Sequence, residues 1–127
     1  MKPRTIIAII HKGNKVLLTK RAREAFKGYW CLPGGSGALE KESYPEKAIV
    51  LEIKQDMDVE FSGSFFTKIS EENEERIYFS GTIKGEPVIK SKETISEIKW
   101  FNIDKAIKMN LGFDDKKILE KFKNIRK

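Results

Sequence analysis

The sequence has very few of the residues on which disulfide, thiol and histidine chemistry depend. Among 127 residues there is one cysteine, Cys31, which excludes an intrachain disulfide and fits a reducing compartment. Any Ser-His-Asp or Cys-His mechanism would have to use the one histidine, His11, which borders an apolar run and is expected to be structural. The longest apolar run, residues 6–10, is too short to cross a bilayer or to form a signal-peptide core. We therefore expect a cytoplasmic protein with no membrane partner.

The composition is that of a soluble globular chain long enough for one domain with a core. Hydrophobic residues make up 39% of the sequence and charged residues 35%. The net charge of +6 favours anionic partners such as nucleotides or nucleic acid, and the alternative is a lysine-rich solvated surface. Because no nucleic-acid-binding motif is present, we do not expect nucleic acid as a partner. No linker or repeat divides the chain, so residues 1–127 are predicted to form a single domain.

Hydrophobic periodicity predicts strands, one central helix, further strands and C-terminal helices. The central helix covers residues 46–57, where Ile49, Ile53 and Met57 recur at i, i+4 and i+8, with Pro45 in the first turn and Ser43 as cap. The glycines that precede it, residues 34–37, are read as loop. Strands are predicted at residues 5–10, 15–20, 59–69, 76–83 and 96–101, and helical spacing recurs at 103–109 and 116–122. This order predicts an α/β fold in which helices cover both sides of a mixed β-sheet.

Three polar side chains share one face of the central helix. Glu52, Gln55 and Asp56 lie at i, i+3 and i+4, which points two carboxylates and an amide toward one place. Such oxygen ligands suit Mg²⁺ or Mn²⁺. The alternative is a solvated face of an amphipathic helix. The preceding Gly34-Gly35-Ser36-Gly37 allows close backbone approach to a ligand, but it is neither a P-loop nor a dinucleotide fingerprint.

Together these segments resemble the Nudix box and the residues that lead into it. The family pattern is Trp-x-Leu-Pro-Gly-Gly, followed by Gly-x5-Glu-x7-Arg-Glu-U-x-Glu-Glu-x-Gly-U, where U is aliphatic. The chain has Tyr-Trp-Cys-Leu-Pro-Gly-Gly at 29–35, then Glu40 and Glu42, Pro-Glu-Lys-Ala at 45–48, and Glu52. Residues 15–21, 93–101 and 113–119 extend the resemblance over nearly the whole chain. The resemblance implies a MutT-like Nudix α/β/α sandwich with a mixed β-sheet between helices.

The resemblance also implies a reaction and a site. It implies a hydrolase that uses Mg²⁺ or Mn²⁺ to cleave the phosphoanhydride bond of a nucleoside diphosphate linked to another moiety, and it allows a homodimer. Glu52 would be the main metal ligand or the base that assists water, and Asp56 a second ligand. Further metal contacts are assigned to Gln55, Gly35 and Glu42, with Glu40, Glu93 and Glu97 as additional carboxylates. Substrate binding is assigned to Arg21, Arg23, Lys27, Phe26 and Phe113.

The box also departs from the family pattern. Counted from Glu52, Leu51 stands in place of the arginine, Gln55 and Asp56 in place of two glutamates, and Asp58 in place of the glycine. The Pro-Gly-Gly lies two residues too far upstream. Either the loop carries two extra residues, or Glu42 serves as the first box glutamate with one residue inserted before the helix. We expect weaker metal binding than in a complete box, with Leu51 packing against the loop. The alternative function is a catalytically impaired nucleotide-binding or regulatory Nudix module.

Overall fold

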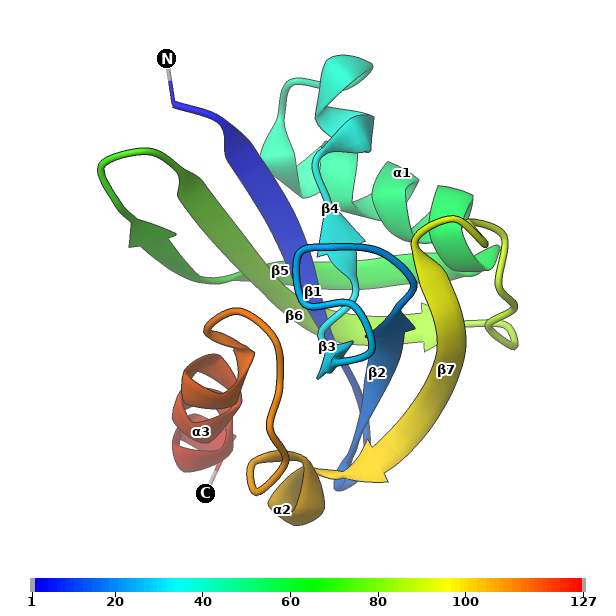
Figure 1. Ribbon diagram of the computed structural model, residues 1–127, viewed down its shortest axis with the longest axis vertical. Helices are drawn as coiled ribbons and strands as arrows, with labels where there is room; N and C mark the ends of the chain where they lie inside the picture. The colour runs from blue at the N-terminus through cyan, green and yellow to red at the C-terminus, as the bar shows by residue number, and fades with distance from the viewer. Residues whose placement is uncertain (1, 127) are drawn as a thin grey trace.

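The computed structural model describes residues 2–126, so Met1 and Lys127 of the predicted domain lie outside the described residues. Four strands, a 3₁₀ helix and the long helix α1 come first along the chain, and three long strands and two helices follow. Figure 1 shows their arrangement in space. In order, the elements are β1 (Arg4–Lys12), β2 (Lys15–Arg21), β3 (Trp30–Cys31), β4 (Gly34–Gly35), the 3₁₀ helix η1 (Gly37–Glu40), α1 (Pro45–Met57), β5 (Glu60–Ser70), β6 (Glu75–Lys84), β7 (Ile95–Asn102), α2 (Ile103–Ala106) and α3 (Asp115–Arg126).

The strands form one mixed sheet that opens in the middle. Its order is β3-β2-β1-β6-β5, with β7 paired to the other edge of β2 and β1 running parallel to β6. Strands β1 and β2 pair only beside their connecting turn, at His11↔Val16 and Lys12↔Lys15. Beyond that point they diverge, and β4 pairs with Ile6 and Ile7 of β1 instead. The divergence therefore brings the Gly-Gly segment into the centre of the sheet.

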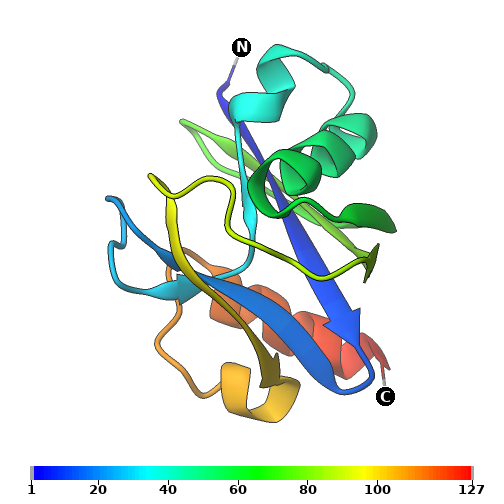
Figure 2. The same cartoon turned by 90° about the vertical axis from the view of Figure 1, so that its right-hand side faces the viewer.

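Side chains of β1 alternate between two hydrophobic cores, as the period of a strand requires. Ile6, Ala8 and Ile10 face the core that α1 covers, whereas Ile7 and Ile9 face the core that α3 covers. The two helices lie on opposite sides of β1 (Figures 1 and 2), which confirms the predicted α/β fold. None of the helices within residues 2–126 is both long and apolar enough to span a bilayer.

The structure corrects three local expectations. Gly34 and Gly35 were expected in a loop but form strand β4, because a Cβ on Gly34 would lie only 2.3 Å from the Ile6 carbonyl oxygen and only glycine permits this pairing. The predicted Ser43 cap is wrong, since Tyr44 precedes Pro45 at the start of α1 and no side chain caps the helix. The helix predicted at 103–109 is shorter, because α2 ends at Ala106.

Candidate functional site

The C-terminal half of α1 carries two buried carboxylates one helical turn apart. Glu52 is 7% exposed and Asp56 is 8% exposed, although the periodicity of the helix alone allows both to face solvent. The Glu52 Oε1 atom accepts a hydrogen bond from the N–H of Ala38 at 3.1 Å. A Cβ added to Gly35 would lie 2.9 Å from Glu52 Oε2. The glycine therefore lets β4 and η1 come into direct contact with the carboxylate.

Asp56 is held from the other side by the segment that precedes β7. The Ser91 hydroxyl donates to Asp56 Oδ1 at 2.8 Å, and the Lys90 N–H donates to the Asp56 carbonyl at 2.9 Å. Burial, with the adjacent Glu52 and more distant Glu93 carboxylates adding to it, raises the pKa of Asp56 to about 7, whereas the Ser91 hydrogen bond opposes the rise. Two buried carboxylates this close together favour the binding of a cation, because a positive charge between them offsets their repulsion.

Both carboxylates lie in the wall of an open cleft with a volume of about 550 Å³. The cleft also contains basic side chains from β2, the following loop and β6, so acidic and basic groups face the same space. The basic residues are Arg21, Arg23 and Arg76. Other residues in the lining include Gly35, Glu40, Gln55, Glu74, Glu93 and Phe113. A site with two acids and several arginines matches a ligand that carries both metal-bound and free phosphate oxygens.

Most of the site residues predicted from the sequence lie in this cleft. Glu52, Asp56, Gln55 and Gly35 share it with the predicted substrate residues Arg21, Arg23 and Phe113. Three others are not among the lining residues, namely Glu42, Lys27 and Phe26. Phe26 still contacts the Phe113 ring, with centroids 4.7 Å apart. Of the additional carboxylates considered, Glu40 and Glu93 line the cleft, whereas Glu97 pairs with Lys20 at 3.2 Å.

The loop between the glycines and α1 explains how the box tolerates its departures. The Glu42 carboxylate accepts the Tyr44 N–H at 3.3 Å, so it supports the start of α1. Leu51 is half-buried and packs against the hydrophobic core that α1 covers. The loop is joined to the helix by the Ala38 N–H, which donates directly to Glu52.

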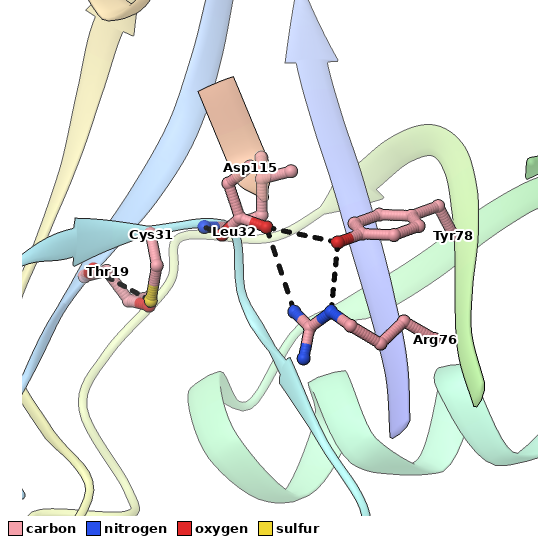
Figure 3. Close-up of polar contacts among 6 residues, drawn as sticks. All are labelled: Thr19, Cys31, Leu32, Arg76, Tyr78 and Asp115. Atoms are coloured by element: carbon pink, nitrogen blue, oxygen red, sulfur yellow. Dashed lines mark hydrogen bonds and ion pairs between the residues drawn. The ribbon is translucent and has the colours of Figure 1, made fainter. Parts of the chain in front are cut away.

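A second polar cluster, of which Arg76 also lines the cleft, was not predicted from the sequence (Figure 3). Asp115 is fully buried in the first turn of α3, and its Oδ2 atom accepts the Leu32 N–H at 2.8 Å. Its Oδ1 atom accepts the Tyr78 hydroxyl at 3.3 Å and lies 3.8 Å from Arg76 Nη2. Arg76 in turn donates from Nε to the Tyr78 oxygen at 3.1 Å. The cluster therefore joins α3, β6 and the segment just before the Gly-Gly pair.

One signal in the sequence could have revealed this cluster. Asp115 precedes Ile118, Leu119 and Phe122 by three, four and seven residues, which places it on the apolar face of α3. A carboxylate on a buried face requires a partner, and Arg76 is the charged residue of an otherwise apolar stretch of β6. Which cation pairs with which acid could not be read from the sequence, because Arg76 and Asp115 are 39 positions apart (115 − 76) on different elements.

Arg76 also faces the cleft. Its side chain is 6% exposed, and its guanidinium lies 4.5 Å from the centre of the Phe113 ring. Arg21 approaches the same ring at 5.1 Å, so Phe113 lies in contact with two guanidinium groups. Within residues 2–126, Arg76 Nη1 makes no hydrogen bond although the residue lines the cleft. It therefore offers a free donor to a ligand.

The oxygen donors of the cleft fit a hard divalent cation. Burial, followed by the neighbouring Glu52 carboxylate, raises the pKa of Asp56, and Gln55 and Glu93 line the same cleft and add oxygens. Within the described residues there is no group of three or more His, Cys, Asp or Glu side chains arranged to hold a metal ion. Mg²⁺ usually keeps several waters and takes only one or two protein carboxylates when it binds phosphates. Glu52 and Asp56 can therefore supply the protein's share of such a site.

Comparison with known proteins relates the chain to NUDIX proteins in sequence and in fold. The family model described as NUDIX domain matches residues 1–122. An ADP-ribose pyrophosphatase of Methanocaldococcus jannaschii is 30% identical over 122 residues, which cover 90% of this chain and 69% of that protein. The MutT NUDIX hydrolase of Burkholderia pseudomallei superposes with a TM-score of 0.78 at 20% identity, covering 94% of this chain and 97% of that one. The NUDIX domain of Shewanella oneidensis NrtR, in complex with ADP ribose, gives 0.76 at 19% identity, covering 100% and 90%.

Proposed function

The chain belongs to the Nudix family of pyrophosphohydrolases, and we propose that it uses a divalent metal to hydrolyse a nucleoside diphosphate linked to another moiety. The observation that carries this proposal is the buried pair Glu52 and Asp56, set against the Gly-Gly segment in a cleft that also contains arginines. ADP-ribose is the first substrate to test, because a relative is named for its hydrolysis and a structural neighbour binds it.

In the proposed site, Glu52 and Asp56 would hold Mg²⁺ or Mn²⁺, and Gln55 and the Gly35 backbone would offer further oxygen donors. When bound, the ion supplies charge neutralisation for the diphosphate and lowers the pKa of a coordinated water. Ser91 and the Ala38 N–H orient the two carboxylates before substrate arrives. Glu93 lines the same cleft and is our candidate to accept the proton of the attacking water.

The basic and aromatic side chains account for the rest of the substrate. Arg21, Arg23 and Arg76 would bind phosphate oxygens of the substrate, and the Phe113 ring, which the guanidinium groups of Arg21 and Arg76 approach, forms part of the wall beside them. Water attacks one phosphorus, the bridging P–O bond breaks, and ADP-ribose yields AMP and ribose 5-phosphate. The single domain over residues 1–127 and a cytoplasmic location are part of this proposal, and the buried free thiol of Cys31 accords with a reducing compartment.

The decisive test replaces Glu52 and a matched acid on the same helix. We expect Mg²⁺- or Mn²⁺-dependent release of AMP from ADP-ribose by the unmodified protein, and loss of at least about two orders of magnitude in E52Q. The control is E46Q, because Glu46 is exposed in the first turn of α1 and lies outside the cleft. Turnover that survives E52Q unchanged, or that falls equally in E46Q, would rule out this assignment.

A second function has support from the incomplete box. Gln55 replaces a carboxylate with a neutral amide, and no third acid completes a metal cluster within residues 2–126. The same cleft would then bind ADP-ribose without turning it over, as a regulatory module does. Calorimetry with ADP-ribose separates the two functions: saturable binding without hydrolysis in Mn²⁺ favours the module, and a gain of turnover in the Q55E D56E double variant would identify a decayed active site.

A further inference from the structure

The buried carboxylate of Asp115 accepts hydrogen bonds from distant parts of the chain rather than from its own helix. A residue in the first turn of a helix commonly bonds the free N–H groups of that turn. Asp115 instead bonds the N–H of Leu32, 83 residues away, and the hydroxyl of Tyr78, 37 residues away. Burying a carboxylate in this way is costly, and the burial raises the pKa of Asp115 to about 6 even though Leu32, Arg76 and Tyr78 oppose the rise.

The segment that Asp115 holds leads straight into the site. Leu32 lies between β3 and the Pro-Gly-Gly segment, whose Pro33 carbonyl accepts the Ala8 N–H at 2.8 Å. Gly34 and Gly35 then pair with β1 so closely that a Cβ on Gly34 would meet the Ile6 carbonyl at 2.3 Å. Within residues 32–35, Gly34 and Gly35 are therefore fixed by β1, and Leu32 is fixed by Asp115 of α3.

A second hydrogen bond joins the start of α3 to the segment that leads into the Gly-Gly pair. The Gly112 N–H donates to the Trp30 carbonyl at 2.9 Å, so residues 112–115 are tied to residues 30–32 at both ends. Phe113 lies between these two ties and forms part of the cleft wall. The position of the aromatic wall and the position of the Gly-Gly segment are thereby set by the same pair of hydrogen bonds.

We propose that Asp115 is a positioning residue, which holds the Leu32 N–H and thereby places Gly34 and Gly35 against Glu52. This inference rests on the proposed hydrolysis at Glu52. Its carboxylate does not touch substrate. Arg76 balances its charge at 3.8 Å, and Tyr78 occupies its second oxygen. Two other titratable groups lie near it. The charge of Asp114 raises the pKa of Asp115, and the charge of Asp115 adds to the burial that raises the pKa of the Cys31 thiol. Loss of the acceptor should loosen the segment while the hydrophobic cores remain.

The test compares three variants at Asp115 and Tyr78 with a matched control. D115A removes the acceptor, D115N keeps an oxygen that can accept the Leu32 N–H but removes the charge, and Y78F removes only the second partner. D114N is the control, because Asp114 is an exposed acid one residue earlier whose charge acts on Asp115 but which accepts neither the Leu32 N–H nor the Tyr78 hydroxyl. Amide hydrogen exchange is followed by NMR at Leu32, Gly34 and Gly35, with a core amide of β1 as reference, and kcat and KM are measured with ADP-ribose and Mg²⁺.

We expect exchange at Leu32 to be faster in D115A by on the order of tenfold relative to the core amide, and kcat to fall by a similar factor. KM should change little. D115N and Y78F should keep both the protection of Leu32 and most of kcat, and D114N should match the unmodified protein. If D115A does not fold, D115N decides the question: retention of both the Leu32 protection and most of kcat supports the proposal, and a kcat far below that of the unmodified protein with Leu32 still protected refutes it.

Two results would overturn the proposal. One is a D115A variant with lowered stability but unchanged kcat, which would make the cluster purely structural. The other is D115N with protected Leu32 and a kcat as low as that of D115A, which would make the charge, not the hydrogen bond, responsible. If the unmodified protein hydrolyses neither ADP-ribose nor any other nucleoside diphosphate derivative in a panel, the proposed function fails by itself. The loop position is then still read from the Gly34 and Gly35 amide signals, which should move in D115A and stay in D115N.

Discussion

Because Glu52 and Asp56 lie close together and buried on α1, we expect the D56N substitution to raise the free energy of unfolding. Burial and the neighbouring Glu52 raise the pKa of Asp56 from 3.8 to about 7, which corresponds to about 4 kcal/mol at 1.36 kcal/mol per pH unit. Asparagine has the same shape, can accept the Ser91 hydroxyl, and can donate its amide protons to Glu52. It keeps the hydrogen bonds and removes the second charge.

The sign of the effect follows from where the proton is held. Below pH 3.8 Asp56 is protonated in both the folded and the unfolded chain, and its ionisation costs nothing. Between pH 3.8 and about 7 the unfolded chain ionises while the folded protein keeps its proton, so the free energy of unfolding falls as pH rises. Above about pH 7 the loss is complete. The advantage of D56N over the unmodified protein should therefore grow across this window and then level off.

The assay is urea unfolding in EDTA at pH 5 and pH 8. We expect D56N to exceed the unmodified protein by about 2 to 4 kcal/mol at pH 8, and the advantage to be about 2 kcal/mol smaller at pH 5. Mg²⁺ at pH 8 should stabilise the unmodified protein and narrow the gap. The control is D58N, because Asp58 is exposed at the end of the same helix in a left-handed conformation that asparagine tolerates. A D56N variant that is less stable at pH 8, or an advantage that does not depend on pH, would refute the reasoning.

Two further predictions concern the neighbourhood of the carboxylates. G35A should lower metal-dependent turnover on the order of tenfold, because its Cβ would lie 2.9 Å from Glu52 Oε2 and displace that carboxylate; an unchanged rate would mean that Glu52 tolerates the shift. Cys31 is 3% exposed and burial raises the pKa of its thiol to about 11, so iodoacetamide at pH 8 should modify it only after unfolding. Mass spectrometry of the native and the urea-treated protein checks this, and rapid labelling of the native form would contradict it.

The sequence predicted those parts of the fold that depend on local periodicity. The spacing of Ile49, Ile53 and Met57 located α1, and the β-branched run at 6–10 located β1, because each pattern matches the geometry of one element. The Gly-Gly pair was misassigned to loop for a physical reason. Glycine signals flexibility in isolation, whereas β4 uses the same lack of a Cβ to fit against Ile6 of β1, a long-range contact that leaves no local pattern.

The candidate site divides in the same way. Glu52 and Asp56 were found because they share one helix, and their spacing places them together in any packing. Arg76 and Asp115 were missed because their meeting depends on how β6 and α3 are placed in space. Ser91 was missed for a similar reason, since it belongs to an irregular segment whose path is fixed by hydrogen bonds to the end of α1.

The bond between Leu32 and Asp115 also determines when the site can exist during synthesis of the chain. A nascent chain that has been extended to residue 100 already contains the Gly-Gly pair and all of α1, yet it lacks the acceptor for Leu32. The parallel pairing of β1 with β6 likewise waits for residues about seventy positions downstream. Contacts of such long sequence separation are slow to form because a long loop must close first. The cleft therefore cannot be complete before residue 115 has been added, and shorter chains carry the acids of α1 without an acceptor for the Leu32 N–H.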